Sequence, residues 1–296
     1  MIPRRILRAT QAPDGGVEPR GKPSAETVSP LRRPLAWMSL YGAMIREIAF
    51  TDFKLKYQGS VLGYLWSLAK PLMLFAILYF VFTRLFRLGT SVPHYGQYLL
   101  LGIVLWTYFV DATAVAMVSV VSQRDLIRKV YFPRIVIPIA ASVSSLITLV
   151  LNLVVIFAFI VIGSIGFQVT LPLFLLLLLE LYIFSLGCSL MLAALYVRFR
   201  DLRYIWEVLL QLLFYASPII YPLILLPKKI LTFAALNPIA QIIEDSRKVL
   251  ITPKTTTIAQ IVPWPFALIP YLIPVALLVI GYWYFEAAAA KFAEEL

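Results

Sequence analysis

Long apolar runs separated by short polar connections form the main pattern along this chain of 296 residues. A helix needs about 20 mostly apolar residues to cross the hydrocarbon core of a membrane. We therefore predict an all-α integral membrane protein with six transmembrane helices. The segments that meet this requirement are residues 61–82, 98–121, 135–162, 171–197, 204–221 and 266–285. The fifth of these is short and ends in the sequence SPIIYP.

Two further regions are predicted to be helical without crossing the membrane. Residues 31–57 combine an apolar stripe with a tryptophan and flanking cations, which is typical of an amphipathic interface helix on a membrane surface. The alternative is a polar extension of the first transmembrane helix. Between the fifth and sixth transmembrane helices lie two apolar stretches, each bounded by proline and too short to span. We predict that they form short re-entrant helices on the outer face.

These patterns divide the chain into three predicted regions. Residues 1–30 are rich in proline, glycine and charge and lack the apolar core of a cleaved signal, so we expect a flexible cytoplasmic tail. The interface helix occupies residues 31–57, and the six-helix transmembrane domain occupies residues 58–296.

The excess of basic residues predicts the orientation of the chain. It has 26 Lys and Arg against 15 Asp and Glu, a formal net charge of +11. Membrane proteins collect Lys and Arg in cytoplasmic loops, so this charge does not require a nucleic-acid partner. The basic residues are concentrated before the first transmembrane helix and in the second-to-third and fourth-to-fifth connections. These regions lie on one side if six helices alternate, so both termini of this multi-pass protein are predicted to be cytoplasmic.

Few residues are suited to catalysis or metal binding. Cys188 is the only cysteine and His94 the only histidine, so neither an intrachain disulfide nor a zinc site built from several histidines can form. The sequence also lacks a G-x-x-x-x-G-K-[ST] phosphate-binding loop, an H-E-x-x-H motif and a G-x-S-x-G motif. We therefore predict that this chain is not an enzyme and binds neither a metal nor a cofactor.

The connection between the second and third transmembrane helices contains the sequence LIRKVYFPRIVIP. Ser122 and Asp125 match the capping-box pattern just before it, and Asp125 and Lys129 have the spacing of an i,i+4 ion pair. Pro133 disfavours helix at the residue before it. We expect a short helix that binds a cytoplasmic partner. The alternative is that its cations only hold the loop on the cytoplasmic side. The connection RFRDLRY, residues 198–204, has the same character.

Charged and aromatic residues inside the transmembrane helices are candidates for a transport pathway, because charges at membrane depth usually face protein or water. Asp111 and Glu180 lie near the middle of their helices, each one turn from an aromatic residue. They can line a water-filled route through the protein, or they can form interhelical hydrogen bonds; the sequence leaves both possibilities open. The candidates for this pathway are Lys70, Tyr79, Tyr108, Asp111, Glu180 and Phe184.

Several of these charged and aromatic residues have a simpler alternative role that does not involve a pathway. Lys70 and Glu207 lie near the cytoplasmic ends of their helices, where their side chains can extend to the membrane surface. Tyr79 belongs to a helical stripe of aromatic residues, which more often packs against other helices or lies at the membrane interface than lines a pathway. The stripe consists of Phe75, Tyr79, Phe82 and Phe86.

Five short sequences occur in a characteristic order: FKLKYQGSVLGYLWSLAKPL, LIRKVYFPRIVIP, RFRDLRY, SPIIYP and LNPI. Together they resemble the membrane subunit of ABC-type polysaccharide and polyol-phosphate exporters, which include O-antigen, capsule and teichoic-acid permeases. The resemblance covers residues 35–284. It implies a homodimer in the bacterial plasma membrane that works with two copies of a separate ABC ATPase, and ATP and Mg²⁺ would bind that partner. The implied substrate is a lipid-linked glycan or a teichoic-acid-like polymer. The implied partners also include the membrane lipids around the protein.

The same resemblance implies roles for two sets of residues. The elements that couple to the ATPase would contain Arg124, Asp125, Leu126, Ile127, Arg128, Lys129, Val130, Tyr131, Arg198, Arg200, Asp201 and Arg203. Residues 222–251 would form an outer gate that includes Pro222, Pro227, Asn237 and Pro238.

The sequence departs from this family in its long tail and in Lys70, which stands where relatives more often carry a neutral polar residue. Three alternative functions remain. One is an ABC-type exporter of a drug or small lipid. Another is an ion-coupled secondary transporter, which would usually show paired broken helices in two repeated halves. The third is a membrane-embedded transferase, for which the sequence shows no catalytic cluster.

Overall fold

The computed structural model describes residues 33–60, 62–87, 92–129, 132–166, 170–227, 231 and 236–292. The regular structure within these ranges is entirely helical, which confirms the predicted all-α class. The chain divides into two compact units, residues 1–42 and 43–296. The predicted tail, residues 1–30, lies outside the described residues.

Helix α2, Arg33–Tyr57, occupies the segment predicted to form the interface helix. It begins in the first unit and ends in the second. Within the second unit, Ala49 and Phe53 are buried one turn apart, whereas Phe50 and Leu55 are exposed. The helix therefore packs through one face and leaves apolar side chains on another. Its position at a membrane surface stays a prediction.

Five helices in the described part of the chain are long and apolar enough to cross a membrane: α3 Leu65–Arg84, α5 Tyr95–Ser122, α7 Val136–Ile162, α8 Leu171–Arg198 and a final helix Phe266–Ala289. The final helix joins a 3₁₀ turn, η2 Phe266–Leu268, to α13 Ile269–Ala289. These helices match five of the six predicted transmembrane segments, with ends shifted by about one helical turn or less.

The remaining predicted segment, residues 204–221, forms the shorter helix α9, Leu202–Ala216. Its 15 residues extend about 22 Å at 1.5 Å per residue, less than the hydrocarbon core of about 30 Å. The helix ends early because Ser217 precedes Pro218 and adopts an extended conformation, as a residue before proline favours. A sixth crossing of the membrane therefore stays a prediction.

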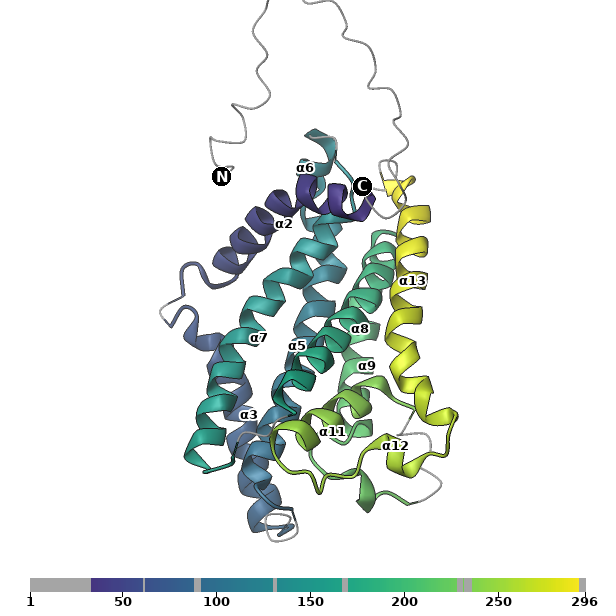
Figure 1. The fold of residues 1–296 in the computed structure, drawn as a ribbon. Helices are drawn as coiled ribbons and strands as arrows, with labels where there is room; N and C mark the ends of the chain where they lie inside the picture. The colour runs from purple at the N-terminus through teal and green to yellow at the C-terminus, as the bar shows by residue number, and fades with distance from the viewer. Residues whose placement is uncertain are drawn as a thin grey trace, which may run out of the picture. The chain divides into compact units, whose positions relative to one another are not determined.

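Helix α5 lies at the centre of the second unit (Figure 1). It packs against α7 on one side and α8 on the other, and α13 packs along α8. Phe109 of α5 stacks on Phe184 of α8 at a centroid distance of 5.2 Å and contacts Trp206 of α9 edge to face. By contrast, few residues of α3 and of the final helix are buried, 11% and 22% of their most apolar segments. Exposed apolar surface of this extent is typical of helices that contact lipid or another subunit.

The connections lie at two opposite ends of this helix arrangement (Figure 1). Helix α6, Arg124–Lys129, joins α5 to α7 at the same end as the turn between α8 and α9. Helix α11, Pro238–Leu250, and helix α12, Ile258–Ile261, lie at the other end. The connections thus alternate between two ends of the unit; which end faces the cytoplasm stays a prediction.

The predicted capping box at Ser122 and Asp125 is wrong. Helix α5 continues to Ser122, whose hydroxyl donates to the Val118 carbonyl at 2.9 Å, as expected for a serine inside a helix. Ser122 is therefore not the cap of the next helix. Instead, the carbonyl of Gln123 accepts from the backbone N–H groups of Leu126 and Ile127.

The segment between α9 and α13 contains a short 3₁₀ turn, η1 Leu223–Leu225, followed by α11 and α12. Asn237 caps α11 by accepting from the Ile239 N–H at 3.0 Å, and Pro238 occupies the first helical position, where its missing N–H costs little. Part of the first predicted re-entrant stretch lies outside the described residues. Entry of these helices into the membrane stays a prediction.

Candidate functional site

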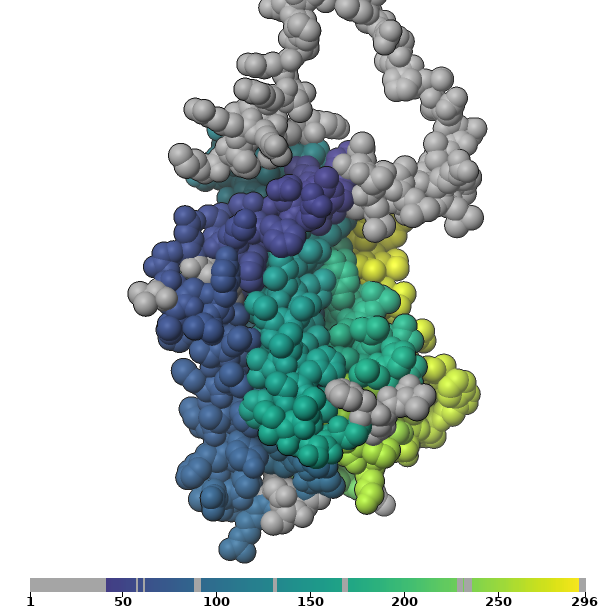
Figure 2. Space-filling model, turned by 60° about the vertical axis from the view of Figure 1, so that its left-hand side comes forward, coloured from purple at the N-terminus to yellow at the C-terminus, as the bar shows by residue number. Residues whose placement is uncertain are grey.

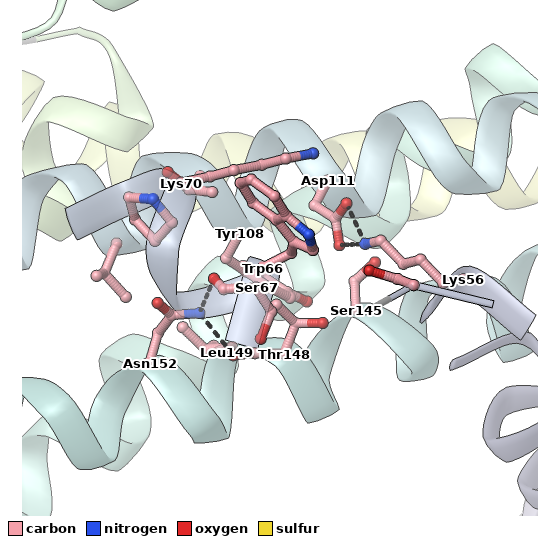
Figure 3. A pocket seen from close by; sticks show the side chains of 14 residues that line it. Lys56, Trp66, Ser67, Lys70, Tyr108, Asp111, Ser145, Thr148, Leu149 and Asn152 are labelled. Carbon is pink, nitrogen blue, oxygen red and sulfur yellow. Dashed lines mark hydrogen bonds and ion pairs between the residues drawn. The ribbon is translucent and has the colours of Figure 1, made fainter. Parts of the chain in front are cut away.

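A pocket of about 410 Å³ lies between the end of α2, the start of α3, and the middle parts of α5 and α7 (Figure 3). Helices α3 and α7 lie side by side on the face shown in Figure 2. Three of the predicted pathway residues, Lys70, Tyr108 and Asp111, line this pocket. Packing therefore brings together polar residues that are far apart in the sequence.

Asp111 forms an ion pair that was not predicted from the sequence. The Nζ atom of Lys56, at the end of α2, lies 2.6 and 2.7 Å from the two carboxylate oxygens of Asp111. The side chains are 32% and 23% exposed, so the pair is partly shielded from solvent. A carboxylate within an apolar helix needs such a partner. For Asp111, the structure favours an interhelical contact over a free pathway carboxylate.

Exchange of the two charges tests whether this pair joins α2 to α5. We expect Asp111→Lys alone to lower the free energy of unfolding by about 1 kcal/mol, because it places two cations together. The double variant Lys56→Asp/Asp111→Lys should regain most of this loss. Chemical denaturation of the protein in detergent measures both. A double variant as unstable as the single one would show that the two side chains do not interact.

Helix α7 contributes buried hydroxyl groups to the same pocket. The hydroxyls of Ser145 and Thr148 are buried and have no hydrogen-bond partner among the described residues. Asn152, one turn further along, donates to the carbonyls of Thr148 at 2.9 Å and Ser67 at 3.3 Å. Since buried polar groups are normally hydrogen-bonded, the two hydroxyls have unused bonding capacity inside the pocket.

Lys70 gives the pocket an unbalanced positive charge. It lies on α3, and its side chain extends along the pocket beside Trp66 (Figure 3). No carboxylate of the described chain forms an ion pair with it, while Lys56 and Asp111 neutralise each other. An anion that enters the pocket would therefore find a cation and buried hydroxyls together.

The other predicted pathway residues lie elsewhere. Phe184 is buried against Phe109. The ring of Tyr79 stacks on those of Phe75 and Tyr95. Phe184 and Tyr79 therefore take part in helix packing. Glu180 of α8 accepts a hydrogen bond from Gln241 of α11 at 3.3 Å. The structure therefore does not bring these three residues together with the pocket.

Glu180 belongs to a polar cluster that joins three helices. Gln241 also donates to Asp245 at 2.9 Å, and the Tyr271 hydroxyl of α13 donates to the same carboxylate at 2.6 Å. The cluster thus connects α8, α11 and α13. For Glu180, as for Asp111, an interhelical hydrogen bond is the role that the geometry supports.

A completely buried arginine holds α11 against the rest of the unit. Arg247 donates to the carbonyls of Tyr98 at 3.1 Å, Pro218 at 2.6 Å and Ile219 at 2.6 Å. Its Nη1 atom also lies 3.1 Å from the Glu244 carboxylate. The centroid of the Tyr98 ring lies 3.5 Å from the guanidinium carbon of Arg247. The Tyr98 hydroxyl donates to the Glu244 carboxylate at 3.0 Å. This cluster was not predicted from the sequence.

Two further observations show how closely this cluster is packed. A Cβ atom at Gly102 would lie 2.5 Å from Nη2 of Arg247, so the glycine provides the space for the guanidinium. Burial raises the pKa of the Glu244 carboxyl to about 7, and the Arg247 guanidinium acts in the opposite direction. The predicted gate residues Asn237 and Pro238 form the start of the helix that this cluster holds.

The predicted coupling elements are exposed and charged. All four charged residues of α6 are exposed, whereas Leu126 and Ile127 are half-buried. In the second element, Arg198, Arg200, Asp201 and Arg203 are likewise exposed. Phe199 and Tyr204 beside them are 60% and 70% exposed. Val130 and Tyr131 lie outside the described residues. The two elements thus offer cations and aromatic rings at one end of the unit.

Two polar contacts connect the first of these elements to neighbouring helices. The side chain of Gln123, just before α6, donates to the Asp52 carboxylate of α2 at 3.4 Å. Arg134, just before α7, donates to the carbonyl of Ala289 at the end of α13. Residues on both sides of α6 are therefore hydrogen-bonded to α2 and α13.

Comparison with known proteins places this arrangement among transporters. The ABC-2 type transporter family matches residues 45–251. The chain is 29% identical over 249 residues to the O-antigen export system permease protein RfbA of Klebsiella pneumoniae, which covers 83% of this chain and 92% of that protein. It is 31% identical over 189 residues to the protein of the same name from Myxococcus xanthus, which covers 62% of this chain and 70% of the relative.

Proposed function

Because this chain belongs to the ABC-2 type transporter membrane family, we propose that it is the permease subunit of an ATP-driven exporter of a lipid-linked polysaccharide or teichoic-acid-like polymer. The observation that carries this proposal is the similarity to O-antigen export permeases over 83% of the chain and 92% of the Klebsiella relative. A match of this extent includes the helices that would form a transport route. The multiple apolar helices are in agreement with a multi-pass protein of the bacterial inner membrane.

ATP hydrolysis in such an exporter belongs to a second protein. The sequence has no phosphate-binding loop of the P-loop type. The partner we propose is an ABC ATPase, present in two copies, which binds ATP and Mg²⁺. The exposed cations of α6 and of the α8–α9 turn offer it a docking surface at the end of the unit that we place in the cytoplasm together with both termini.

A second copy of the chain would complete the transporter. Helix α9 exposes Glu207 and Gln211 on an otherwise apolar surface, where they line a groove with Thr107 of α5. Polar side chains at membrane depth find protein or water partners rather than lipid. A homodimer with this groove facing the other copy or the transport route would supply them.

The proposed mechanism converts closure of the ATPase into movement of helices. Binding of ATP would bring the two ATPase copies together and displace α6 and residues 198–204. The contacts of Gln123 with Asp52 and of Arg134 with Ala289 would pass this displacement to α2 and α13. The polymer would leave past residues 222–251, where Arg247 holds α11 in place.

Charge reversal on α6 tests this function. We expect Arg128→Glu/Lys129→Glu to reduce co-purification of the ATPase about tenfold or more, because two favourable charge contacts become repulsive. Polymer export should fall with it, while membrane insertion stays normal. Affinity pull-down and surface detection of the polymer measure the two effects.

The double variant Arg84→Glu/Lys254→Glu serves as the matched control. It reverses two exposed basic residues, one at the end of α3 and one on the loop between α11 and α12, and should retain the ATPase. Normal ATPase binding and export by the α6 variant would refute the coupling role. Export by the intact transporter of a compound that is neither a polysaccharide nor a teichoic-acid-like polymer would refute the substrate class.

A further inference from the structure

Helix α11 takes part in two polar clusters on different faces, and the two clusters differ in charge. On one face, Arg247 neutralises the Glu244 carboxylate at 3.1 Å. The other face belongs to a group of oxygen-bearing side chains from α8, α11 and α13, which we call the oxygen cluster. It consists of Glu180, Gln241, Asp245 and Tyr271. The oxygen cluster thus contains two carboxylates.

No basic side chain of the described ranges balances these two carboxylates. The ion pairs within those ranges involve neither Glu180 nor Asp245. Lys248, three positions after Asp245 on α11, forms no ion pair with it either. Both carboxylates are partly buried. Since carboxylates removed from water are usually paired with a cation or coordinate a metal ion, the oxygen cluster lacks one component.

Two oxygen atoms of the cluster have unused bonding capacity. The Oε1 atoms of Glu180 and Gln241 are buried and accept no hydrogen bond from the described residues. Gln241 is 0% exposed, and its Nε2 atom donates to Glu180 at 3.3 Å and to Asp245 at 2.9 Å. The carboxamide therefore lies against both carboxylates, and its free oxygen belongs to the same cluster. Buried oxygen atoms normally have a hydrogen-bond donor or a cation as partner.

From these observations we infer that the oxygen cluster binds a hard divalent cation, Ca²⁺ or Mg²⁺. The Glu180 and Asp245 carboxylates would balance its charge. The Gln241 amide oxygen and the Tyr271 hydroxyl oxygen, which lies 2.6 Å from Asp245, would act as further ligands together with water. Carboxylate, amide and water oxygens are the ligands that these cations prefer.

This inference departs from the sequence prediction that the chain binds no metal. That prediction rested on histidine and cysteine motifs, and the described residues contain no group of three or more His, Cys, Asp or Glu suited to a metal. In the oxygen cluster, by contrast, two of the ligands are an amide and a phenol. Packing of three helices brings them to the carboxylates, so their spacing in the sequence does not reveal them.

A bound cation would fix α11 to α8 and α13. Helix α11 lies at the end of the unit opposite α6 and belongs to residues 222–251, the predicted outer gate (Figure 1). Removal of the cation would then loosen this segment, because two like charges would remain close together. The inference goes beyond the proposed function, since it concerns an ion that this chain binds by itself and does not depend on the exported compound.

Thermal unfolding of the full-length chain in a neutral detergent tests the inference. The protein is first treated with EDTA at pH 7.5, and CaCl₂ or MgCl₂ is then added. We expect at least one of the two salts to raise the unfolding temperature by about 3 °C or more at saturation, because a ligand that binds only the folded state stabilises it. NaCl at the same ionic strength should cause no such shift.

Two variants identify the ligands. Glu180→Gln/Asp245→Asn keeps the shape of both side chains and should abolish the shift, while its stability in EDTA should equal or exceed that of the intact chain. Tyr271→Phe removes one oxygen and should weaken cation binding about fivefold. This milder variant keeps the inference testable if the double variant does not fold. Glu47→Gln/Glu286→Gln removes two exposed carboxylates and is the matched control, which should keep the full shift.

Hydrogen exchange locates the bound ion. Addition of the cation should slow amide exchange in residues 238–250 of the intact chain and leave the Glu180→Gln/Asp245→Asn variant unchanged. The absence of a shift with both Ca²⁺ and Mg²⁺, or equal shifts in this variant and in the control, would overturn the inference. Stabilisation by acid that neither cation reproduces would also overturn it, because the two carboxylates would then share a proton. None of these measurements involves export, so the proposed function can fail independently.

Discussion

Replacement of Arg247 by methionine will lower the free energy of unfolding by about 3–5 kcal/mol, the usual cost of removing one partner from a buried ion pair. Arg247 is completely buried, and its guanidinium donates to the carbonyls of Tyr98, Pro218 and Ile219. Methionine fills part of the space but leaves these carbonyls without their donor. It also leaves the Glu244 carboxylate buried without its cation. Denaturation of the purified protein in detergent measures the loss.

The partner residue provides a second measurement on the same cluster. The double variant Arg247→Met/Glu244→Gln should be more stable than Arg247→Met alone, because a neutral amide removes the uncompensated charge. Arg84→Met is the matched control, since Arg84 is exposed, and its unfolding should change little. If Arg247→Met and Arg84→Met unfold at the same denaturant concentration, the buried cluster does not stabilise the fold.

Replacement of Gly187 by alanine will have the second largest effect on stability. Gly187 of α8 and Gly281 of α13 face each other where the two helices pack, and a Cβ atom at Gly187 would lie 2.6 Å from the Leu278 nitrogen. All the nearest atoms belong to the backbone of α13, so the helices have to separate. Overpacking of this kind costs about 1–3 kcal/mol, and small residues are typical of close helix contacts in membranes.

The control for Gly187→Ala is an alanine substitution at a glycine that has free space around it. Such a substitution shows the effect of alanine on helix stability without overpacking. Gly42 lies within helix α2, and a Cβ atom at this position would meet no neighbouring atom within 4 Å. Gly42→Ala should be neutral or slightly stabilising, because alanine favours the helix. Thermal unfolding of both variants is the measurement. A Gly187→Ala protein as stable as Gly42→Ala would contradict the close contact of α8 and α13.

The transmembrane helices were largely predictable because long apolar runs are a local property. Five of the six predicted segments became helices of spanning length. In the sixth, α9 ended after Ala216 because Pro218 follows, and this first proline of SPIIYP was the signal for the early end. The predicted capping box failed for a related reason, since a four-residue pattern does not reveal that α5 continues through Ser122.

The pocket was predictable only in part. Lys70, Tyr108 and Asp111 were predicted as pathway residues because polar residues are unusual in apolar helices. Lys56 was not predicted, although it pairs with a residue 55 positions away. Ser145 and Thr148 are common residues of membrane helices, and nothing in their spacing shows that their hydroxyls are left without partners. Such properties depend on which helices meet.

The sequence by itself determined that this protein is helical, where the membrane segments lie, and which connections are strongly basic, because hydropathy and charge act residue by residue along the chain. The tertiary structure alone decided which polar groups are paired. It gave Asp111 a partner in Lys56, Glu180 a partner in Gln241, and Arg247 its three carbonyls. These contacts join helices that are distant in sequence, so they form only when the helices pack together and bury polar groups that must then find each other.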